Sequence, residues 1–301
     1  MSRRLTELLE LIDRFTGGDG EHPTAIDELT FFRQSAPSTA VPVLYQPSLC
    51  VIAQGTKRMR LGEEVLDYDP AHFLIVSADV PMMGEVTRAS PRAPYLALRI
   101  GLDTSMVAEL VAASDRREAA RTPLARAVAV SPMEPALVDV LTRLVSLLET
   151  PDDQPVLAPL ALREITYRLL AGPQGPRLRQ IAARDGQARR IVRALSWLQE
   201  NFAAPLRIDA LAREVGMSAS ALHHYFKSVT AMSPLQYQKR LRLHEARRLM
   251  VGEGLSATDA SFRVGYESPS QFSREYRRLF GAPPQRDIAA LRDDLSSPDA
   301  A

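Results

Sequence analysis

Two segments near the C-terminus share one pattern, and this pattern constrains the fold more than any other feature of the chain. Residues 208–230 and 257–284 each contain a short helical pattern, a turn with a glycine, and a second helical pattern. The two glycines, Gly216 and Gly265, are 49 residues apart and supply the positive φ that ends a helix at a tight turn. The sequence therefore predicts two helix-turn-helix units.

The second helix of each unit has one apolar side and one polar side. Ser218 and Ser268 precede these helices and are candidates for their N-caps. The residues expected to face inward are Leu222 and Phe226 in the first unit and Phe272 and Tyr276 in the second. The opposite, polar side is the one that we expect to enter a DNA major groove.

A long helical pattern joins the two units. Residues 233–251 give 19 helical residues, which is about 28 Å at about 1.5 Å per residue. Such a helix can hold two recognition helices about 34 Å apart, one turn of B-DNA. A single helix-turn-helix pattern occurs in many all-α folds, but two copies joined by a helix of this length favour DNA binding.

Positive charge is concentrated in the same region. Residues 188–290 hold 16 Lys and Arg residues against 9 Asp and Glu residues, although the whole chain has a net charge of only +1. Segregated positive charge favours a polyanionic partner, but by itself it equally suits a solvated surface. Together with the two units, it supports double-stranded DNA as the partner.

The first half of the chain predicts a helix, a β-rich region and two further helices. The apolar residues that predict the first helix, which ends before Gly17, are Leu5, Leu8, Leu9, Ile12 and Phe15. Residues 41–100 alternate short apolar runs with turn signals, which is typical of a compact antiparallel sheet or small barrel. Residues 137–148 and 157–170 predict an antiparallel helix pair, which either caps the barrel or mediates self-association.

We therefore expect an α+β protein with a cupin-like small β-barrel and a helix pair in its N-terminal domain, and an all-α C-terminal domain with two helix-turn-helix units. The expected boundaries are an effector and dimerisation domain at 1–171, a linker at 172–187, a DNA-binding domain at 188–290 and a disordered tail at 291–301. The linker follows from the run AGPQGP, which breaks helical periodicity, and the tail follows from its polar composition.

Composition excludes several classes of protein. No window approaches the ~18 uninterrupted apolar residues of a membrane span, so we expect no membrane association. The charged N-terminus lacks the apolar region of a signal peptide, so we expect a cytoplasmic location. Cys50 is the only cysteine, which excludes an internal disulfide and a cysteine-rich zinc site.

Most of the chain resembles one known family. Residues 189–292 closely resemble the DNA-binding domain of the AraC/XylS family, and VGYESPSQFSREYRRLFGAPP is similar to the signature of that family's second unit. The stretches YQPSLCVIAQGTKRMRLGEEVLDYDPAHFLIVSADVPMMGEV and ASPRAPYLALRIGLD resemble the N-terminal effector domain of one subgroup. The resemblance implies a transcriptional regulator with no cofactor, whose partners are double-stranded DNA, a small-molecule effector and RNA polymerase. A homodimer through the helices of residues 131–171 is one of the two roles that their apolar faces leave open, the other being to cap the barrel.

The resemblance also implies which residues contact DNA. The residues at positions that touch base edges are Ser220, His223, His224, Pro269, Ser270, Gln271 and Arg274. Gln271 and Arg274 are the best readers, because Gln bonds adenine and Arg bonds guanine with ~1 to 3 kcal/mol of discrimination. Pro269 has no side-chain donor, Ser220 is short, and His223 equally suits a surface without a role. The residues expected to meet phosphates are Ser218, Lys227, Ser268, Arg277 and Arg278.

The N-terminal domain contains candidates for sensing a signal. These are Tyr45, Cys50, Gln54, Lys57, Arg58 and Tyr68, each of which equally suits an ordinary structural or surface position. Cys50 lies in an apolar run and is either a buried strand cysteine or a thiol that senses an oxidant or an aldehyde.

Two enzymatic alternatives find little support. A metal-dependent barrel enzyme needs clustered ligands, but this half has only His22 and His72, fifty residues apart. A DNA-repair methyltransferase needs an acceptor cysteine in a Cys-His setting, which Cys50 lacks. We therefore expect no enzymatic activity and no metal site.

Overall fold

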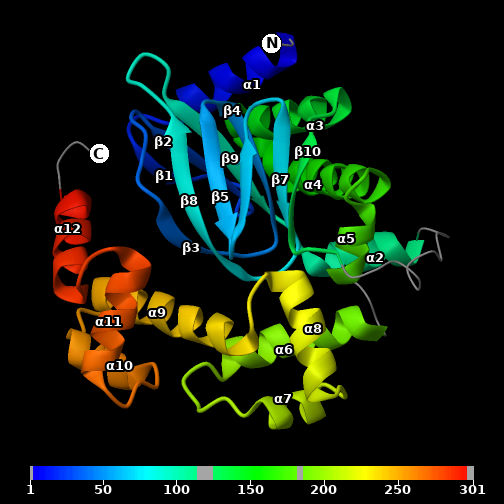
Figure 1. The fold of residues 1–301 in the computed structure, drawn as a ribbon. Coiled ribbons are helices and arrows are strands. Elements are labelled where there is room, and N and C mark those ends of the chain that lie inside the picture. The colour runs from blue at the N-terminus through cyan, green and yellow to red at the C-terminus, as the bar shows by residue number, and fades with distance from the viewer. Residues whose placement is uncertain (1–2, 114–124, 182–185, 297–301) are drawn as a thin grey trace.

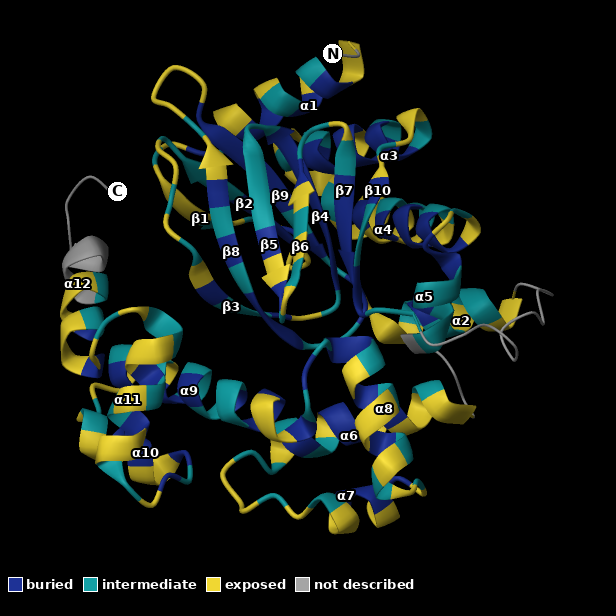
Figure 2. Ribbon diagram, in the orientation of Figure 1, coloured by how far each residue is buried: buried dark blue, intermediate teal, exposed yellow. Residues whose placement is uncertain are grey.

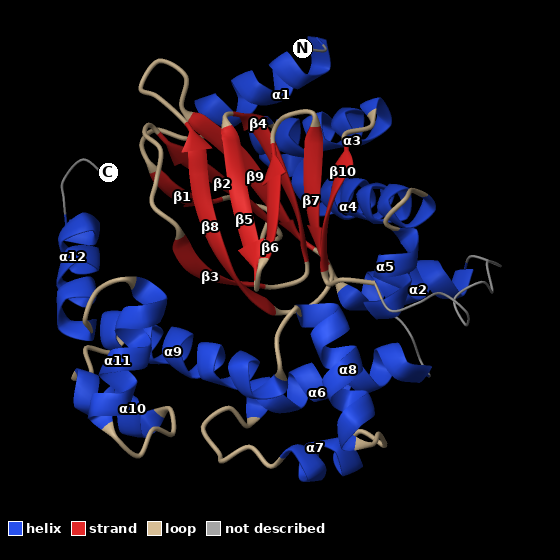
Figure 3. Ribbon diagram, in the orientation of Figure 1, coloured by secondary structure: helices blue, strands red, loops and turns tan. Residues whose placement is uncertain are grey.

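The computed structural model describes residues 3–113, 125–181 and 186–296. Its N-terminal half contains two antiparallel sheets, drawn in Figure 3. The larger sheet has the strand order β1 (Gly20–Pro23), β2 (Leu29–Gln34), β9 (Tyr95–Gly101), β4 (Ser48–Gln54), β7 (His72–Val76) and β10 (Val128–Pro132). The smaller sheet has the order β3 (Val41–Tyr45), β8 (Val80–Arg88), β5 (Thr56–Leu61) and β6 (Glu64–Tyr68).

The central strand β4 shows how the layers are held together. Its first six residues are all buried, because successive side chains of a strand point to opposite faces and both faces are covered. Leu49 and Val51 pack in the cluster formed with the helices, whereas Cys50 and Ile52 pack in the cluster between the sheets. The half is therefore a stack of helices, a six-stranded sheet and a four-stranded sheet.

The expected closed barrel is not formed. Within the described residues, the edge strands β3 and β6 of the smaller sheet have no ladder to the larger sheet, so the two sheets remain separate layers. The larger sheet extends past the expected β region, because β1, β2 and β10 lie outside residues 41–100. The α+β class stands, and the cupin-like barrel is replaced by a two-sheet sandwich.

A group of helices forms one hydrophobic cluster with the outer face of the larger sheet. They are α1 (Arg3–Arg14), α2 (Thr104–Ala113), α3 (Pro135–Ser146), α4 (Gln154–Ala171) and α5 (Gly175–Ile181), with short 3-10 turns η2 (Leu147–Glu149) and η3 (Pro151–Asp153) before α4. The predicted helices α1, α3 and α4 are confirmed. Val156, Leu160 and Tyr167 of α4 are exposed, and the expected homodimer through this region stays a prediction. Figure 2 shows that exposed and buried stretches alternate along α4.

Helix α5 lies inside the segment expected to be a linker. Its Leu178 is fully buried in the cluster of the N-terminal helices. At the other end of the chain, helix α12 (Pro284–Ser296) continues into the segment expected to be a disordered tail, and residues 297–301 lie outside the described residues. Residues 291–296 thus continue a helix in the segment for which the sequence predicts disorder.

The C-terminal half is helical, and both predicted units are confirmed. It contains α6 (Gly186–Glu200), α7 (Ile208–Glu214), α8 (Ala219–Thr230), α9 (Pro234–Gly252), α10 (Ala257–Arg263), α11 (Pro269–Phe280) and α12. Gly216 and Gly265 have φ of 68° and 88° at the two turns. The joining helix α9 has 19 residues and starts at a capping box formed by Ser233 and Gln236.

The two units relate differently to the sandwich (Figure 1). One hydrophobic cluster runs from the space between the sheets, with Leu74 and Val76, into the first unit, with Leu222 and Phe226. The second unit has a separate core around Phe272 and Tyr276. The first unit is therefore packed directly on the sandwich, and the second is held at the far end of α9.

Candidate nucleic-acid interface and interdomain groove

Helix α8 presents the polar side that the sequence predicts. The Ser218 side chain accepts a hydrogen bond from the backbone N–H of Ala221, so it is the N-cap. Leu222 and Phe226 are fully buried, and Phe226 meets Tyr237 of α9 edge to face at 5.4 Å. The predicted contact residues Ser220, His223, His224 and Lys227 are all exposed on the other side.

Helix α11 repeats this arrangement with an aromatic core. The Ser268 side chain caps it by accepting from the N–H of Gln271. Phe272 and Tyr276 are fully buried, with ring centroids 5.4 Å apart. The predicted contact residues Ser270, Gln271, Arg274, Arg277 and Arg278 are exposed, and Ser268 and Pro269 are half-buried.

Glu275 braces α11, and the sequence analysis did not identify it. Its carboxylate accepts hydrogen bonds from Lys239 Nζ at 2.7 Å, Tyr266 Oη at 2.8 Å and Gln271 Nε2 at 3.1 Å. Burial raises the pKa of Glu275, but these three donors outweigh it and hold the pKa below its usual value. The side chain of Gln271 is thus oriented by a carboxylate one helical turn away, at the i, i+4 spacing.

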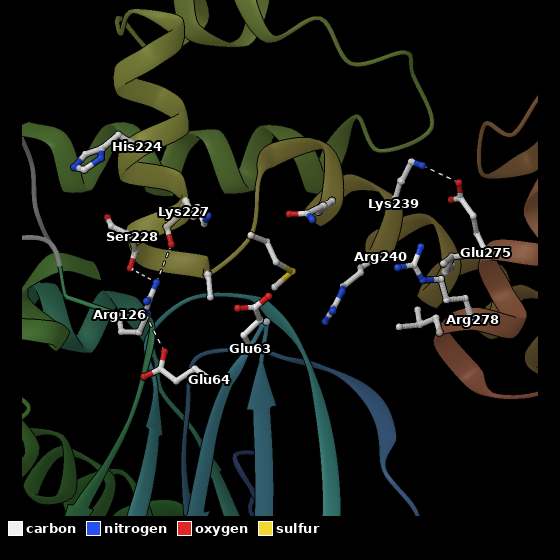
Figure 4. A pocket seen from close by; sticks show the side chains of 16 residues that line it. Glu63, Glu64, Arg126, His224, Lys227, Ser228, Lys239, Arg240, Glu275 and Arg278 are labelled. Atoms are coloured by element: carbon white, nitrogen blue, oxygen red, sulfur yellow. Dashed lines mark hydrogen bonds and ion pairs between the residues drawn. The ribbon is translucent and has the colours of Figure 1, made fainter.

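A groove lies between the sandwich and the two units, with a volume of about 880 Å³ (Figure 4). Its basic side chains are Arg126, Lys227, Lys239, Arg240 and Arg278, and its acidic side chains are Glu63, Glu64 and Glu275. Apolar parts of the wall come from Ala231, Met232, Leu243 and Leu279. The groove therefore combines an excess of positive charge with apolar surface, and it touches both recognition helices.

Arg126 joins the sandwich to the first recognition helix. Its Nη1 donates to the backbone oxygens of Lys227 and Ser228 at 2.8 and 2.9 Å, and its Nε lies 3.0 Å from Glu64 of β6 (Figure 4). A cation at the C-terminal end of a helix interacts favourably with the helix dipole. Tyr237 adds a second link by donating to the backbone oxygen of Asp79 at 2.8 Å. Both links connect residues far apart in the sequence, and no local motif marks them.

Four of the six sensor candidates come together inside the sandwich. Tyr45, Cys50 and Tyr68 are buried in the cluster between the sheets, and Lys57 Nζ donates to Tyr45 Oη at 3.1 Å. Tyr95, which sequence reasoning missed, completes the group, because Lys57 lies 5.8 Å from the centroid of its ring. Burial raises the pKa of Tyr95 to about 12, so its hydroxyl is neutral.

The remaining sensor candidates lie elsewhere. Gln54 donates to the backbone oxygen of Pro94, and the half-buried Arg58 pairs with Asp67 at 2.7 Å on the smaller sheet. Cys50 is 6% exposed, and burial raises the pKa of its thiol, against the opposing effect of Lys57. This environment disfavours the reactive thiolate.

The described residues contain no cluster of three or more His, Cys, Asp or Glu side chains that could hold a metal ion. None of the helices in the described ranges is long and apolar enough to cross a membrane.

Comparison with known proteins relates both halves to one kind of protein. Residues 25–177 match the family described as AraC-type transcriptional regulator N-terminus, and residues 211–288 match a helix-turn-helix domain family. The HTH-type transcriptional activator RhaS of Escherichia coli is 32% identical over 159 residues, 52% of this chain and 56% of the relative. The chain thus spans about half the length of the curated relatives it matches.

Solved structures are similar over nearly the whole chain. ToxT from Vibrio cholerae, with an unsaturated fatty acid bound, aligns with 91% of this chain and 95% of its own, at a TM-score of 0.61 and 10% identity. ToxT bound to (E)-4-(8-methylnaphthalen-1-yl)but-3-enoic acid aligns with 87% of this chain and 99% of its own, at a TM-score of 0.57 and 11% identity. At this identity the likeness concerns the fold.

Proposed function

Because this chain belongs to the AraC-type transcriptional regulators, matched over residues 25–177 and by a helix-turn-helix family over residues 211–288, we propose that α8 and α11 read two successive major-groove segments of one operator. The chain is a DNA-binding regulator with an N-terminal effector domain. The observation that carries the proposal is the pair of capped recognition helices with exposed polar sides, joined by a helix of 19 residues.

We assign different roles to the predicted contact residues of the two helices. Arg274 and Gln271 are the main base readers, with Ser220, His223, His224, Pro269 and Ser270 completing the base contacts. Lys227, Arg277 and Arg278 contact phosphates, and the N-cap hydroxyls of Ser218 and Ser268 still have a proton to donate to a phosphate. The curated relatives are named transcriptional activators, which supports RNA polymerase as a further partner.

A selection experiment tests this proposal. The full chain is incubated with a library of random duplexes, and the enriched operator is then titrated with variants. Arg274→Ala should weaken the selected operator about tenfold or more and relax one base position. Lys227→Ala should weaken all duplexes alike and lower the salt slope by about one. Unchanged affinity and preference in Arg274→Ala would contradict the assignment of α11 to the groove.

We further propose that the interdomain groove binds the effector, and that the effector is a small apolar molecule with a carboxylate. Five basic side chains line the groove beside apolar ones, and Arg240 is among those without a proposed DNA contact. The acids bound by the ToxT structures support this chemistry. A ligand there would lie between the sandwich and both recognition helices, and would shift their relative position as far as it binds one arrangement more tightly than another.

The effector test uses oleate, below its micelle concentration, as the probe. Calorimetry should detect binding, Arg240→Gln should weaken it about tenfold, and methyl oleate should bind far less well. Arg58→Gln is the matched control, because Arg58 pairs with Asp67 on the smaller sheet and does not line the groove. Equal binding of the ester would rule out recognition of the carboxylate.

An oxidant or aldehyde signal at Cys50 is the less supported form of effector control. The thiol is 6% exposed and its pKa is raised by burial, whereas a sensor thiol needs access and thiolate character.

A further inference from the structure

The side chain of Arg242, near the middle of α9, bonds to the loop that leads into the first helix-turn-helix unit and to the turn of the second. Its guanidinium donates to three backbone oxygens in the loop between α6 and α7: Phe202 at 2.7 Å, Ala204 at 2.9 Å and Ala203 at 3.2 Å. The same side chain donates to the backbone oxygen of Gly265, in the turn of the second unit, at 2.8 Å. One planar guanidinium thus ties the loop before the first unit to the turn of the second.

The loop before the first unit also touches the second unit directly at this point. A Cβ placed on Gly265 would lie 2.0 Å from the backbone oxygen of Ala203, so the backbones are in close contact. Phe202 packs against the cores of both units. Gln238 of α9 holds the same loop by donating to the oxygens of Phe202 and Ala204 at 3.0 and 2.8 Å. The units are therefore joined by a second connection besides the continuous helix α9.

We infer that Arg242 fixes the distance and rotation between α8 and α11, and with them the spacing between the two operator half-elements that the protein accepts. This inference rests on the proposed reading of DNA by both helices. If α9 were the only connection, the second unit, whose core includes Leu243 to Met250 of α9, could twist relative to the first at the middle of this helix. The fork of Arg242 prevents that twist, because it would pull the oxygen of Gly265 away from a donor that also holds the first unit.

The range of half-element spacings that the protein accepts is a sensitive measure of how rigidly α8 and α11 are held relative to each other. One inserted base pair moves the second half-element by about 3.4 Å and rotates it by roughly 35°. A rigid reader then loses the contacts of one unit, whereas a loosened reader follows the displaced element. Arg242 would therefore set operator choice without touching DNA.

The test compares wild type, Arg242→Ala and Arg242→Lys on duplexes selected from a random library. Insertion of one base pair between the half-elements should weaken wild-type binding roughly thirtyfold, and binding of the Arg242 variants less than about fivefold. Arg248→Ala is the control, because this exposed arginine of α9 pairs only with Glu245 and Glu253 among the described residues, and it should behave like wild type.

A second measurement needs no DNA and keeps the inference testable if Arg242→Ala folds poorly. Spin labels at Ser220→Cys and Ser270→Cys, in a Cys50→Ser background, report the distance between the recognition helices. The distribution should be narrow with Arg242 and broader in Arg242→Lys, whose single ammonium cannot bridge both units. Equally narrow distributions with equal spacing preference would overturn the inference while DNA reading stands. Failure of wild type to enrich any bipartite duplex would overturn the proposed function and this inference together.

Discussion

Replacing the two turn glycines by alanine separates backbone strain from contact between the units. Gly216 and Gly265 occupy the same position in the two units, with φ of 68° and 88°. A Cβ at Gly216 meets nothing within 4 Å, whereas a Cβ at Gly265 lies 2.0 Å from the backbone oxygen of Ala203. Both substitutions impose a left-handed alanine, but only the second also pushes two backbones apart.

The expected magnitudes follow from this difference. Left-handed alanine costs roughly 1–2 kcal/mol in the free energy of unfolding, which is the whole effect expected for Gly216→Ala. Gly265→Ala adds overpacking of about 1–3 kcal/mol, because the contact is with backbone that cannot rotate away. The second unit has its own core, so the added loss should appear there. For a domain of roughly 60–100 residues, such as the helical C-terminal half, 1 kcal/mol shifts Tm by roughly 4–8 °C.

Thermal unfolding by circular dichroism and hydrogen exchange of α10 and α11 measure both variants. Gly265→Ala should have the lower Tm and faster exchange in α10 and α11, and Gly216→Ala should leave exchange there unchanged. Gly281→Ala is a further control in the second unit, with φ of 82° and open space around its Cβ. If Gly265→Ala were no more destabilising than Gly281→Ala, the close contact between the units would be wrong.

Three further predictions concern other parts of the chain. Cys50→Ser should keep operator binding and the transcriptional response after oxidant or aldehyde challenge, since the thiol is buried; loss of the response would restore the sensor hypothesis. Burial, with smaller effects of two nearby arginines, lowers the pKa of His244 to about 4, below the ~6.5 of an unfolded chain. The stability that neutral His244 contributes is therefore fully present above pH ~6.5, and up to ~3 kcal/mol of it is lost as the pH falls toward 4. Urea titrations should find this loss reduced in His244→Phe. Arg126→Ala should speed hydrogen exchange in the last turn of α8 roughly fivefold, because the carbonyls there lose a charged donor, and unchanged exchange would exclude Arg126 as a link between sandwich and helix.

The features predictable from sequence are those encoded locally. Gly216 and Gly265 mark their turns because few other residues adopt positive φ, and Ser218 marks a helix start because its side chain caps the backbone three residues on. The exposed side of each recognition helix then follows from helical periodicity. These signals each span fewer than about ten residues.

What the sequence did not reveal depends on contacts between distant residues. Arg126 reaches α8 across 101 positions, and Tyr95 joins the group around Lys57 only because β9 and β5 lie in facing sheets. The choice between a closed barrel and two sheets depends on which edge strands pair, which alternating hydrophobicity leaves undetermined. The run AGPQGP predicts a linker at residues 172–187, but the burial of Leu178 in this segment depends on tertiary packing that no local pattern indicates.

The hydrophobic cluster that runs from between the sheets into the first unit limits how this architecture can be recombined. A chimera cut at the boundary near residue 187 would separate Val76 and Val128 from Leu195 and Val229, and would leave apolar surface on both pieces. The second unit has a closed core of its own and is the part that should transplant intact. Exchange of effector domains among such regulators therefore requires that the sandwich and the first helix-turn-helix unit be transferred together, because they share one hydrophobic cluster.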